Sequence, residues 1–497
     1  MTLRHLTTAS GWRVCSIIGA RSARRAYATR SGNASPSRRF YTAAGLVRTA
    51  CLGLGAAVAL QGDTGLRLLR QAYAEGSDDL SGDHVPFPEP GPEPKPAHHL
   101  MGLVAADKDT DIIAASSRIN FTAFSETHAC QIASNAPCED VFHTGTIMSA
   151  SAHKPLFGCA GIYDGHAGPE TARVLHGVLP PYMGLKLQQP TMAKDPEDMT
   201  QRLKEAFLKA DEAILTTAKQ ALQRGSDNAD TMNALWPALS GSCALVSIFD
   251  LRDSKLYVAN TGDSRAVLGR HTEGTYKAHA LSFDHTGFNQ AEVARIQSEH
   301  PGETGIIDPA TGRIFGLAIV RAFGDVRWKW DDATNMDAHK RFWGPKPRPG
   351  GVVKTPPYVT AEPEVTVTEL VVRGKTADFV IMASDGLWDH LSNEDAVLCV
   401  EEWLRRKRAG DIRKLTTSET MANEDMYYDE RPGYGLGWRI KPEYFSYEDD
   451  NAAACLVRNA FGGRRKNLVE RVSKAQPPHA RDVHDDTTVL VTFYGDV

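Results

Sequence analysis

Residues 156–168 read LFGCAGIYDGHAG, and this stretch decides the fold. Its apolar run predicts a buried strand that ends at Tyr163. Asp164, Gly165 and His166 follow at once, so a carboxylate, a glycine and an imidazole meet at the end of a strand. Gly165 lets the backbone turn and brings its carbonyl close to any group that Asp164 holds. The stretch predicts either a site for a hard cation with a protonatable group beside it, or an ordinary Asp-Gly turn.

Two further apolar strands, far away in the sequence, also have an aspartate at one end. The strand DFVIM (378–382) runs into ASDGLWD, which contains Asp385, and Asp485 comes just before the strand TTVLVTF (487–493). Because neighbouring strands of an antiparallel sheet run in opposite directions, these acids and Asp164 are predicted to converge on one rim. Unpaired carboxylates repel one another in a cleft, and a divalent cation removes that conflict. Oxygen ligands without a cysteine favour Mg²⁺ or Mn²⁺ over zinc.

A hairpin pattern sets the type of sheet. An apolar strand over Ser242–Phe249, a turn, and a second strand over Lys255–Asn260 lie so close in sequence that they must pair antiparallel. This argues against a doubly wound parallel sheet. The second strand ends at TGDSR, which presents Asp263 at a turn before a third strand, AVLG. Helices are predicted over Met199–Leu222, from the spacing of its apolar residues, and from Asn393 to a stop at Gly410.

Composition narrows the class of function. The chain has 497 residues, 56 Lys and Arg against 61 Asp and Glu, and a net charge of −5, so there is no electrostatic case for binding nucleic acid. Its eight cysteines form no CxxC pair, and several lie in apolar runs. They are predicted to be buried free thiols in a reducing compartment, not disulfides or zinc ligands.

The amino end differs from the rest. Residues 1–62 contain nine arginines and no acid, which is typical of a mitochondrial transit peptide; a basic disordered tail is the alternative. Within it, residues 49–60 are apolar but too short to span a bilayer, and they suit a sorting signal or a weak inner-membrane anchor. Residues 63–99 form a proline-rich linker. The folded domain is predicted over 100–497, with an insertion at about 411–450 that is either a docking or regulatory surface or a packed surface loop.

The chain resembles the metal-dependent serine/threonine protein phosphatases of type 2C over about residues 118–493. Seven motifs occur in the family order: NAPCED, GIYDGHAG, SGSCAL, NTGDSRAVL, LAIVRAFGD, ASDGLWD and HDDTTVLV. Residues 135–140 and 451–463 are similar to the pyruvate dehydrogenase phosphatase branch, which is mitochondrial. The resemblance implies an α+β fold, an α-β-β-α sandwich of two antiparallel sheets flanked by helices, with a di-metal cleft at one end.

The resemblance also implies metal ligands at matching positions. Asp164 would bridge two cations, and the carbonyl of Gly165 would contact one of them. Asp385 and Asp485 would complete the second. The implied cofactors are two Mg²⁺ or Mn²⁺ ions per active site, with a third in some members of the family.

Further residues match supporting positions of the family. Glu139 would hold a water at the metal, with Asp140 supporting it. Asp263 and Asp389 match positions that in some members join the looser third metal. His166 matches the proton donor that protonates the departing serine oxygen. No covalent phosphoenzyme is needed, because the activated water attacks phosphorus directly.

The implied activity is hydrolysis of phosphoserine and phosphothreonine in mitochondrial proteins, with the pyruvate dehydrogenase complex as the first candidate substrate. Another phosphoprotein of the mitochondrion or its intermembrane space is the alternative, and a non-catalytic phosphatase-like scaffold is a third. The matrix is the favoured compartment, and association with the inner membrane stays open. One departure matters: many members have a phosphate-gripping arginine where this chain has Asn135. Arg118 or Arg321 are candidate substitutes, although the sequence places neither in the cleft.

Overall fold

The computed structural model describes residues 112, 116–122, 125–149, 154–187, 196–225, 227–349, 352–421, 427–431 and 435–497. The expected transit peptide at 1–62, the linker at 63–99 and the predicted start of the domain at residue 100 lie outside these ranges. Within them, no helix is both long enough and apolar enough to cross a bilayer.

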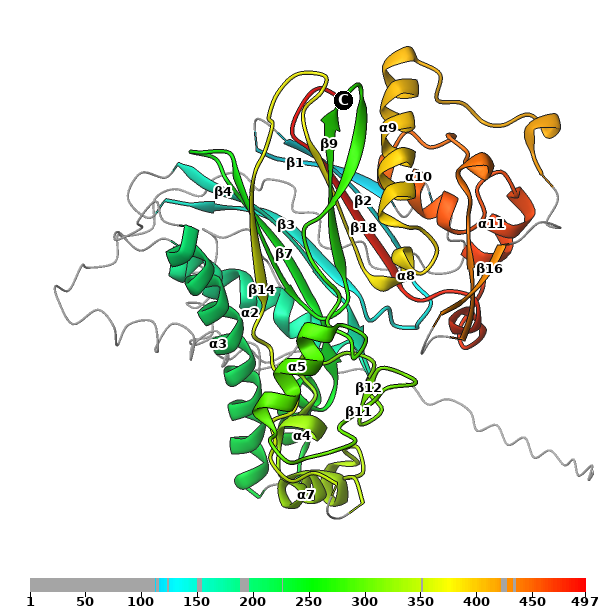
Figure 1. Ribbon diagram of the computed structural model, residues 1–497. Helices are drawn as coiled ribbons and strands as arrows, with labels where there is room; N and C mark the ends of the chain where they lie inside the picture. Colours follow the sequence, from blue (N-terminus) through cyan, green and yellow to red (C-terminus); the bar gives the residue numbers. More distant parts are fainter. Residues whose placement is uncertain are drawn as a thin grey trace, which may run out of the picture. The chain divides into compact units, whose positions relative to one another are not determined.

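Two antiparallel sheets lie at the centre of the described chain (Figure 1). The first has the order β1-β2-β18-β15-β9-β10 and consists of β1 (Ser116–Thr122), β2 (Ser125–Ile132), β18 (Thr487–Phe493), β15 (Phe379–Ala383), β9 (Arg265–Thr272) and β10 (Thr275–Ala280). The second has the order β14-β8-β7-β4-β3 and consists of β14 (Glu364–Glu369), β8 (Lys255–Thr261), β7 (Ala244–Asp250), β4 (Pro155–Tyr163) and β3 (Val141–Met148).

Three small sheets complete the strands. The one that matters for function joins β5 (Gly165–His166), β6 (Gly241–Ser242) and β13 (Phe323–Gly324). The other two are the pairs β11 (Ile307–Asp308) with β12 (Arg313–Ile314) and β16 (Tyr427–Arg431) with β17 (Gly435–Arg439).

Helices cover the outer face of each sheet (Figure 1). The second sheet packs against α2 (Glu170–Leu187) and α3 (Pro196–Gln223), and α4 (Ala229–Leu239) joins the same core by packing on these two helices. The first packs against α8 (Asp385–Trp388), α9 (Asn393–Ala409) and α10 (Ala452–Ala460), and α11 (Lys466–Ser473) contributes to the same core. Between β10 and β14 the chain forms α5 (Gln290–Glu299), α6 (Val326–Lys329) and α7 (Asp332–Phe342). Short 3-10 turns are η1 (Thr417–Glu419), η2 (Pro442–Tyr444) and η3 (His479–Asp482).

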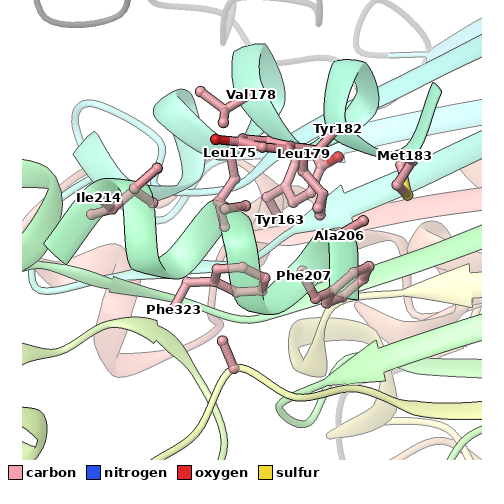
Figure 2. Close-up of a cluster of buried hydrophobic side chains, with 14 of the residues drawn as sticks. Tyr163, Leu175, Val178, Leu179, Tyr182, Met183, Ala206, Phe207, Ile214 and Phe323 are labelled. Carbon is pink, nitrogen blue, oxygen red and sulfur yellow. The ribbon is translucent and has the colours of Figure 1, made fainter. Parts of the chain in front are cut away.

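Alternation along β4 explains why its sequence is apolar throughout. Phe157, Cys159 and Tyr163 join the core beneath α2 and α3, which Figure 2 shows around Tyr163. Ala160 and Ile162 point the other way, into the core between the two sheets. Both faces of the strand are therefore covered. β15 and β18 alternate in the same way between the inter-sheet core and the core under α9 and α10, so the predicted α-β-β-α sandwich is confirmed.

The strands and helices that were predicted from strong local sequence patterns are present in the structure. β4, α3 and β18 lie where expected, and α9 starts after the N-cap Ser392 and ends at Gly410, which has a φ of 69°. The hairpin of β7 and β8 is antiparallel. The following strand, β9, does not extend that hairpin. It pairs with β10 and β15, because the TGDSR turn carries the chain from one sheet to the other.

The cysteines of the described ranges are free thiols, as predicted. Five of the six are buried. The Sγ atoms of Cys399 and Cys455, on α9 and α10, lie 3.9 Å apart, well beyond the roughly 2.05 Å of a disulfide bond.

Aromatic rings attach part of the 411–450 segment to the domain. The ring of Trp438 stacks on His390 at 4.5 Å, and Phe445 is buried in the core under α9. Residues 422–426 and 432–434 of this segment lie outside the described ranges. A docking or regulatory role for the segment stays a prediction.

We predict that a buried histidine in the second sheet makes the folded protein less stable in acid. His143 on β3 stacks on Tyr163 at 5.6 Å, and burial together with the neighbouring His176 lowers the pKa of His143 to about 3. In the unfolded chain an imidazole has a pKa of about 6.5, so below that pH the unfolded state binds more protons than the folded state. The free energy of unfolding therefore falls as the pH drops from about 6.5 toward the folded pKa.

We expect wild type to lose about 1–2 kcal/mol more stability between pH 7 and pH 5 than the variant His143→Phe, which keeps a ring but does not titrate. Urea unfolding at the two pH values measures this difference. The exposed His279 on β10 provides a matched control, because His279→Phe should lose as much as wild type. Equal losses in wild type and His143→Phe would contradict the assignment.

Candidate metal centre and active site

Asp164 lies where β4 ends and β5 begins, and its main-chain carbonyl accepts a hydrogen bond of 2.8 Å from the Cys243 amide. The pKa of Asp164 is raised well above its ordinary value, first by burial and then by the charges of Asp140, Asp385 and Asp263. Four acids from four separate parts of the chain are thus close enough to act on one another. The convergence comes from the antiparallel sheets, which bring the ends of distant strands to one edge.

Asp385 begins α8, directly after β15. Burial and the charges of Asp263 and Asp389 raise its pKa well above the ordinary value. Burial also raises the pKa of Asp263, to about 6. The structure therefore places Asp164 and Asp385 in one cluster with Asp263 and Asp389, the two residues matched to the looser site.

A cysteine that the sequence did not single out lies in this cluster. One ligand atom each of Asp164, Cys243 and Asp263 lies within 4.8 Å of the others. Burial and the charges of both aspartates raise the pKa of the Cys243 thiol well above its ordinary value, and the thiol donates to Asp263 Oδ1 at 3.3 Å. A neutral thiol is a poor ligand for a hard cation, so Cys243 acts here as a donor to a carboxylate.

Glu139 and Asp140 lie between β2 and β3. Asp140 Oδ2 accepts hydrogen bonds from Ser384 at 2.8 Å and Thr488 at 2.7 Å, while its buried Oδ1 atom has no partner. Burial and the charge of Asp486 raise the pKa of Asp140 to about 8. Glu139 accepts a hydrogen bond of 2.7 Å from the Gly168 amide, which ties it to the loop after His166.

Position 165 has no room for a side chain. A Cβ atom there would lie 2.5 Å from the main-chain oxygen of Glu139. The short strand β5 can therefore pass directly over residue 139 only with a glycine at position 165. This close approach fixes the position of Glu139 relative to Asp164.

Asp485 and Asp486 lie just before β18 and differ in role. Asp485 forms an ion pair with Arg481 and accepts from the Asp486 amide at 2.7 Å. Asp486 is buried, and its carboxylate accepts from the Glu139 amide at 2.8 Å and the Asn135 amide at 3.0 Å. These main-chain bonds outweigh burial and lower the pKa of Asp486. Asp486 thus holds the Glu139 loop in place, a role that only the structure reveals.

Asn135 stands where many family members have an arginine, and its side chain binds two neighbouring acids. Its side-chain amide donates to Glu139 at 3.2 Å and to Asp486 at 3.0 Å. Arg118 is engaged by Asp450, and Arg321 makes two hydrogen bonds to Glu292. Neither arginine is directed to the acidic cluster.

Arg481 is the arginine that lies beside the cluster. Besides pairing with Asp485, its charge lowers the pKa of both Glu139 and Asp385, although burial raises each of them overall. Its side chain is 48% exposed, so it stands at the rim. In the sequence, the only sign of this ion pair is that Arg481 stands four residues before Asp485. That spacing is too common in proteins to predict an active-site arginine.

His166 and Asp325 form a pair that the small sheet assembles. His166 Nε2 lies 2.7 Å from Asp325 Oδ2, although the two residues are 159 positions apart. Burial alone would lower the pKa of His166, but the charge and hydrogen bond of Asp325 outweigh it and raise the pKa. A Cβ at Gly241, between them on β6, would lie 2.2 Å from the imidazole, so only glycine fits. Nothing in the sequence pairs Asp325 with His166, because the two residues are far apart along the chain.

The cluster has the character of a site for hard divalent cations. Its available donors are carboxylate oxygens, several of which raise one another's pKa, and one buried oxygen of Asp140 has no partner. A cation would lower the electrostatic free energy of these acids. Oxygen donors of this kind suit Mg²⁺ or Mn²⁺.

Comparison with known proteins agrees with this chemistry. The pattern of the family described as Protein phosphatase 2C matches residues 127–428. A protein phosphatase 2C homologue of Schizosaccharomyces pombe is 36% identical over 377 residues, 73% of this chain and 79% of that protein. The mitochondrial pyruvate dehydrogenase (acetyl-transferring) phosphatase 1 of Saccharomyces cerevisiae is 35% identical over 402 residues, 74% of this chain and 68% of that protein. Its human counterpart is 34% identical over 282 residues, 52% of this chain and 48% of that protein.

The family pattern covers most of the two sheets and the loops that carry Asp164, Asp263 and Asp385. The strand β18 lies beyond the matched residues, but it pairs with both β2 and β15 in the first sheet. The fold and the family thus agree, and the chain belongs to the protein phosphatase 2C family of metal-dependent protein serine/threonine phosphatases.

Proposed function

We propose that this phosphatase removes phosphate from serine and threonine residues of mitochondrial proteins and that the phosphorylated pyruvate dehydrogenase complex is its substrate. The observation that carries the catalytic part is the convergence of Asp164, Asp263 and Asp385, with His166 on the adjoining strand β5. The substrate is supported by the names of the relatives in yeast and human.

Two Mg²⁺ or Mn²⁺ ions would be held by Asp164, the carbonyl of Gly165, Asp385 and Asp485, and Asp263 with Asp389 would suit a third. Bound cations of this kind neutralise phosphate oxygens and lower the pKa of a water molecule. Neutralisation matters because the phosphoserine dianion otherwise repels an anionic nucleophile. The chain's own task is to hold its acids in place before the ions bind.

Three residues then act on substrate and water. Glu139, fixed by the amide of Gly168, would accept a hydrogen bond from the attacking water. His166, whose pKa is raised by Asp325, would donate its proton to the serine oxygen as the bond to phosphorus breaks. Arg481 would offer positive charge to the phosphate at the rim, where many family members use the arginine that Asn135 replaces.

The compartment is proposed from the sequence and the relatives together. The basic segment 1–62 suits import into mitochondria, and relatives that bear mitochondrial names are 34–35% identical to this chain over the aligned residues. The matrix is favoured, with the inner membrane and the intermembrane space as alternatives. A non-catalytic scaffold is disfavoured, because Asp164, Asp385, Asp485 and His166 are all present.

We expect the full chain to release phosphate from phosphorylated pyruvate dehydrogenase faster than from unrelated mitochondrial phosphoproteins, and only with Mg²⁺ or Mn²⁺. Phosphate release, measured with each cation and with excess EDTA, tests both parts. Substantial turnover in EDTA would contradict the metal mechanism. Equal rates on all phosphoproteins would leave a phosphatase whose substrate is not pyruvate dehydrogenase.

A further inference from the structure

Two arginines share one tryptophan ring, that of Trp328, which follows closely after Asp325 in the sequence. The guanidinium carbon of Arg327 lies 5.7 Å from the centre of the Trp328 ring, and that of Arg348 lies 4.9 Å from it. Arg348 also lies 5.2 Å from the ring centre of Phe315. The indole is itself fixed, because its N–H donates to the Ile314 carbonyl at 2.9 Å. Both guanidinium groups thus contact one aromatic ring whose position is fixed.

These two arginines have no anionic partner in the described part of the chain. The Nε atom of Arg327 and the Nε and Nη2 atoms of Arg348 are buried without a hydrogen bond. Burial and the nearby charge of Arg327 lower the pKa of Arg348 to about 10. Burying these charged nitrogens without partners costs free energy, which a bound anion would recover.

Other arginines stacked on aromatic rings show the usual arrangement. Arg341 lies 5.0 Å from the ring centre of Phe342, yet it is paired with Asp227 and Asp337. The arginines of the cavity that the 411–450 segment helps to line are occupied too: Arg413 pairs with Glu419, Arg406 pairs with Glu402, and Arg464 donates to the Glu419 carbonyl at 2.9 Å. Arg327 and Arg348 therefore differ by lacking carboxylates rather than by being stacked.

The pair lies next to the residue that orients the proposed proton donor. Arg327 is two positions after Asp325, and the Trp328 amide donates to the Asp325 carbonyl at 2.9 Å in the single turn of α6. Because consecutive Cα atoms are about 3.8 Å apart, the Cα of Arg327 lies at most about 7.6 Å from that of Asp325. Arg327 thus lies in the short turn that Asp325 begins.

We propose that Arg327 and Arg348, on the Trp328 platform, bind an anionic side chain of the phosphoprotein that flanks the phosphoserine being hydrolysed. The ligand is a carboxylate or a second phosphate, both of which match the planar donors of a guanidinium. The site would select acidic phosphorylation sequences. This inference rests on the proposed phosphatase activity.

The test compares three phosphoserine peptides that differ only near the phosphoserine: one with neutral flanks, one with acidic residues on both sides, and one with a second phosphoserine. We expect Arg327→Met and Arg348→Met each to lower kcat/KM roughly tenfold on the acidic and doubly phosphorylated peptides. The neutral peptide and p-nitrophenyl phosphate should be hydrolysed as by wild type. If both arginines bind one anion, the double variant should lose much less than the product of the two single effects.

The three peptides also identify the ligand. A loss confined to the doubly phosphorylated peptide indicates a phosphate, and a loss on both anionic peptides indicates any carboxylate or phosphate. The stacked and paired Arg341 is the matched control, because Arg341→Met should not change the preference among peptides.

Two results would overturn the inference. One is an equal loss on neutral and acidic peptides, and the other is a wild-type enzyme without preference for acidic flanks.

Thermal unfolding tests whether the arginines have only a structural role. Methionine keeps the apolar stem and removes one of two like charges, so the Tm of Arg348→Met should equal or exceed that of wild type. A lowered Tm with uniformly reduced rates would show that the arginines only support packing. Hydrolysis of p-nitrophenyl phosphate reports the phosphatase activity independently of this outcome.

Discussion

The substitution Asp385→Asn is expected to lower phosphate release from a phosphoserine peptide by at least about a thousandfold. The carboxylate of Asp385 lies among Asp263, Asp389 and Asp140, whose charges raise its pKa along with burial. An amide has a similar shape but no charge, so it should weaken cation binding while leaving the fold intact.

Stability gives a second readout for the same variant. A carboxyl group whose pKa is raised in the folded state destabilises the protein once the pH exceeds its unfolded pKa, which is about 3.9 for aspartate. In EDTA at neutral pH, Asp385→Asn should therefore unfold at a temperature equal to or above that of wild type. Mg²⁺ should raise the Tm of wild type more than that of the variant, because a ligand that binds the folded state stabilises it in proportion to its affinity.

A nearby acid outside the cluster provides the control. Asp482 lies three positions before Asp485 on η3, and its side chain is 77% exposed. Asp482→Asn should keep both the activity and the Mg²⁺-dependent shift in Tm. If Asp385→Asn retained a substantial fraction of wild-type turnover, the acidic cluster would not be the catalytic metal centre.

Replacing His166 with asparagine should slow hydrolysis of a phosphoserine peptide by about a hundredfold or more, the range for a well-placed general acid. The same variant should hydrolyse p-nitrophenyl phosphate nearly as fast as wild type, since nitrophenolate leaves without needing a proton. Steady-state kinetics on the two substrates measures this contrast. The exposed His479 supplies the control, because His479→Asn should change neither rate.

Asp325 acts through His166 as a positioning residue, and the pH profile tests this. The charge and hydrogen bond of Asp325 raise the pKa of His166 against the opposing effect of burial. Because only the protonated imidazole can donate, kcat on the phosphoserine peptide should fall as the pH rises through this pKa. In Asp325→Asn the fall should begin at a lower pH. Equal losses on both substrates in His166→Asn, or an unshifted profile in Asp325→Asn, would assign the pair a structural role only.

The sequence by itself determined the strands, the long helices and the places where acids interrupt them. β4, β15 and β18 are apolar on both faces because each lies between a helix layer and the opposite sheet, and this pattern is visible residue by residue. The helix α9 was readable from its caps, Ser392 and Gly410. These patterns are local, so they can be recognised in the sequence without knowing which strands pair.

Only the tertiary structure decided which distant groups meet. The pairing of His166 with Asp325 depends on the small sheet and on the space left by Gly241, and the hold of Asp486 on the Glu139 loop depends on the pairing of β18 with β2. The crossing of β9 into the other sheet and the platform of Arg327, Trp328 and Arg348 arise in the same way. These contacts join residues whose order in the chain says nothing about their distance, because sheet register and layer packing set that distance.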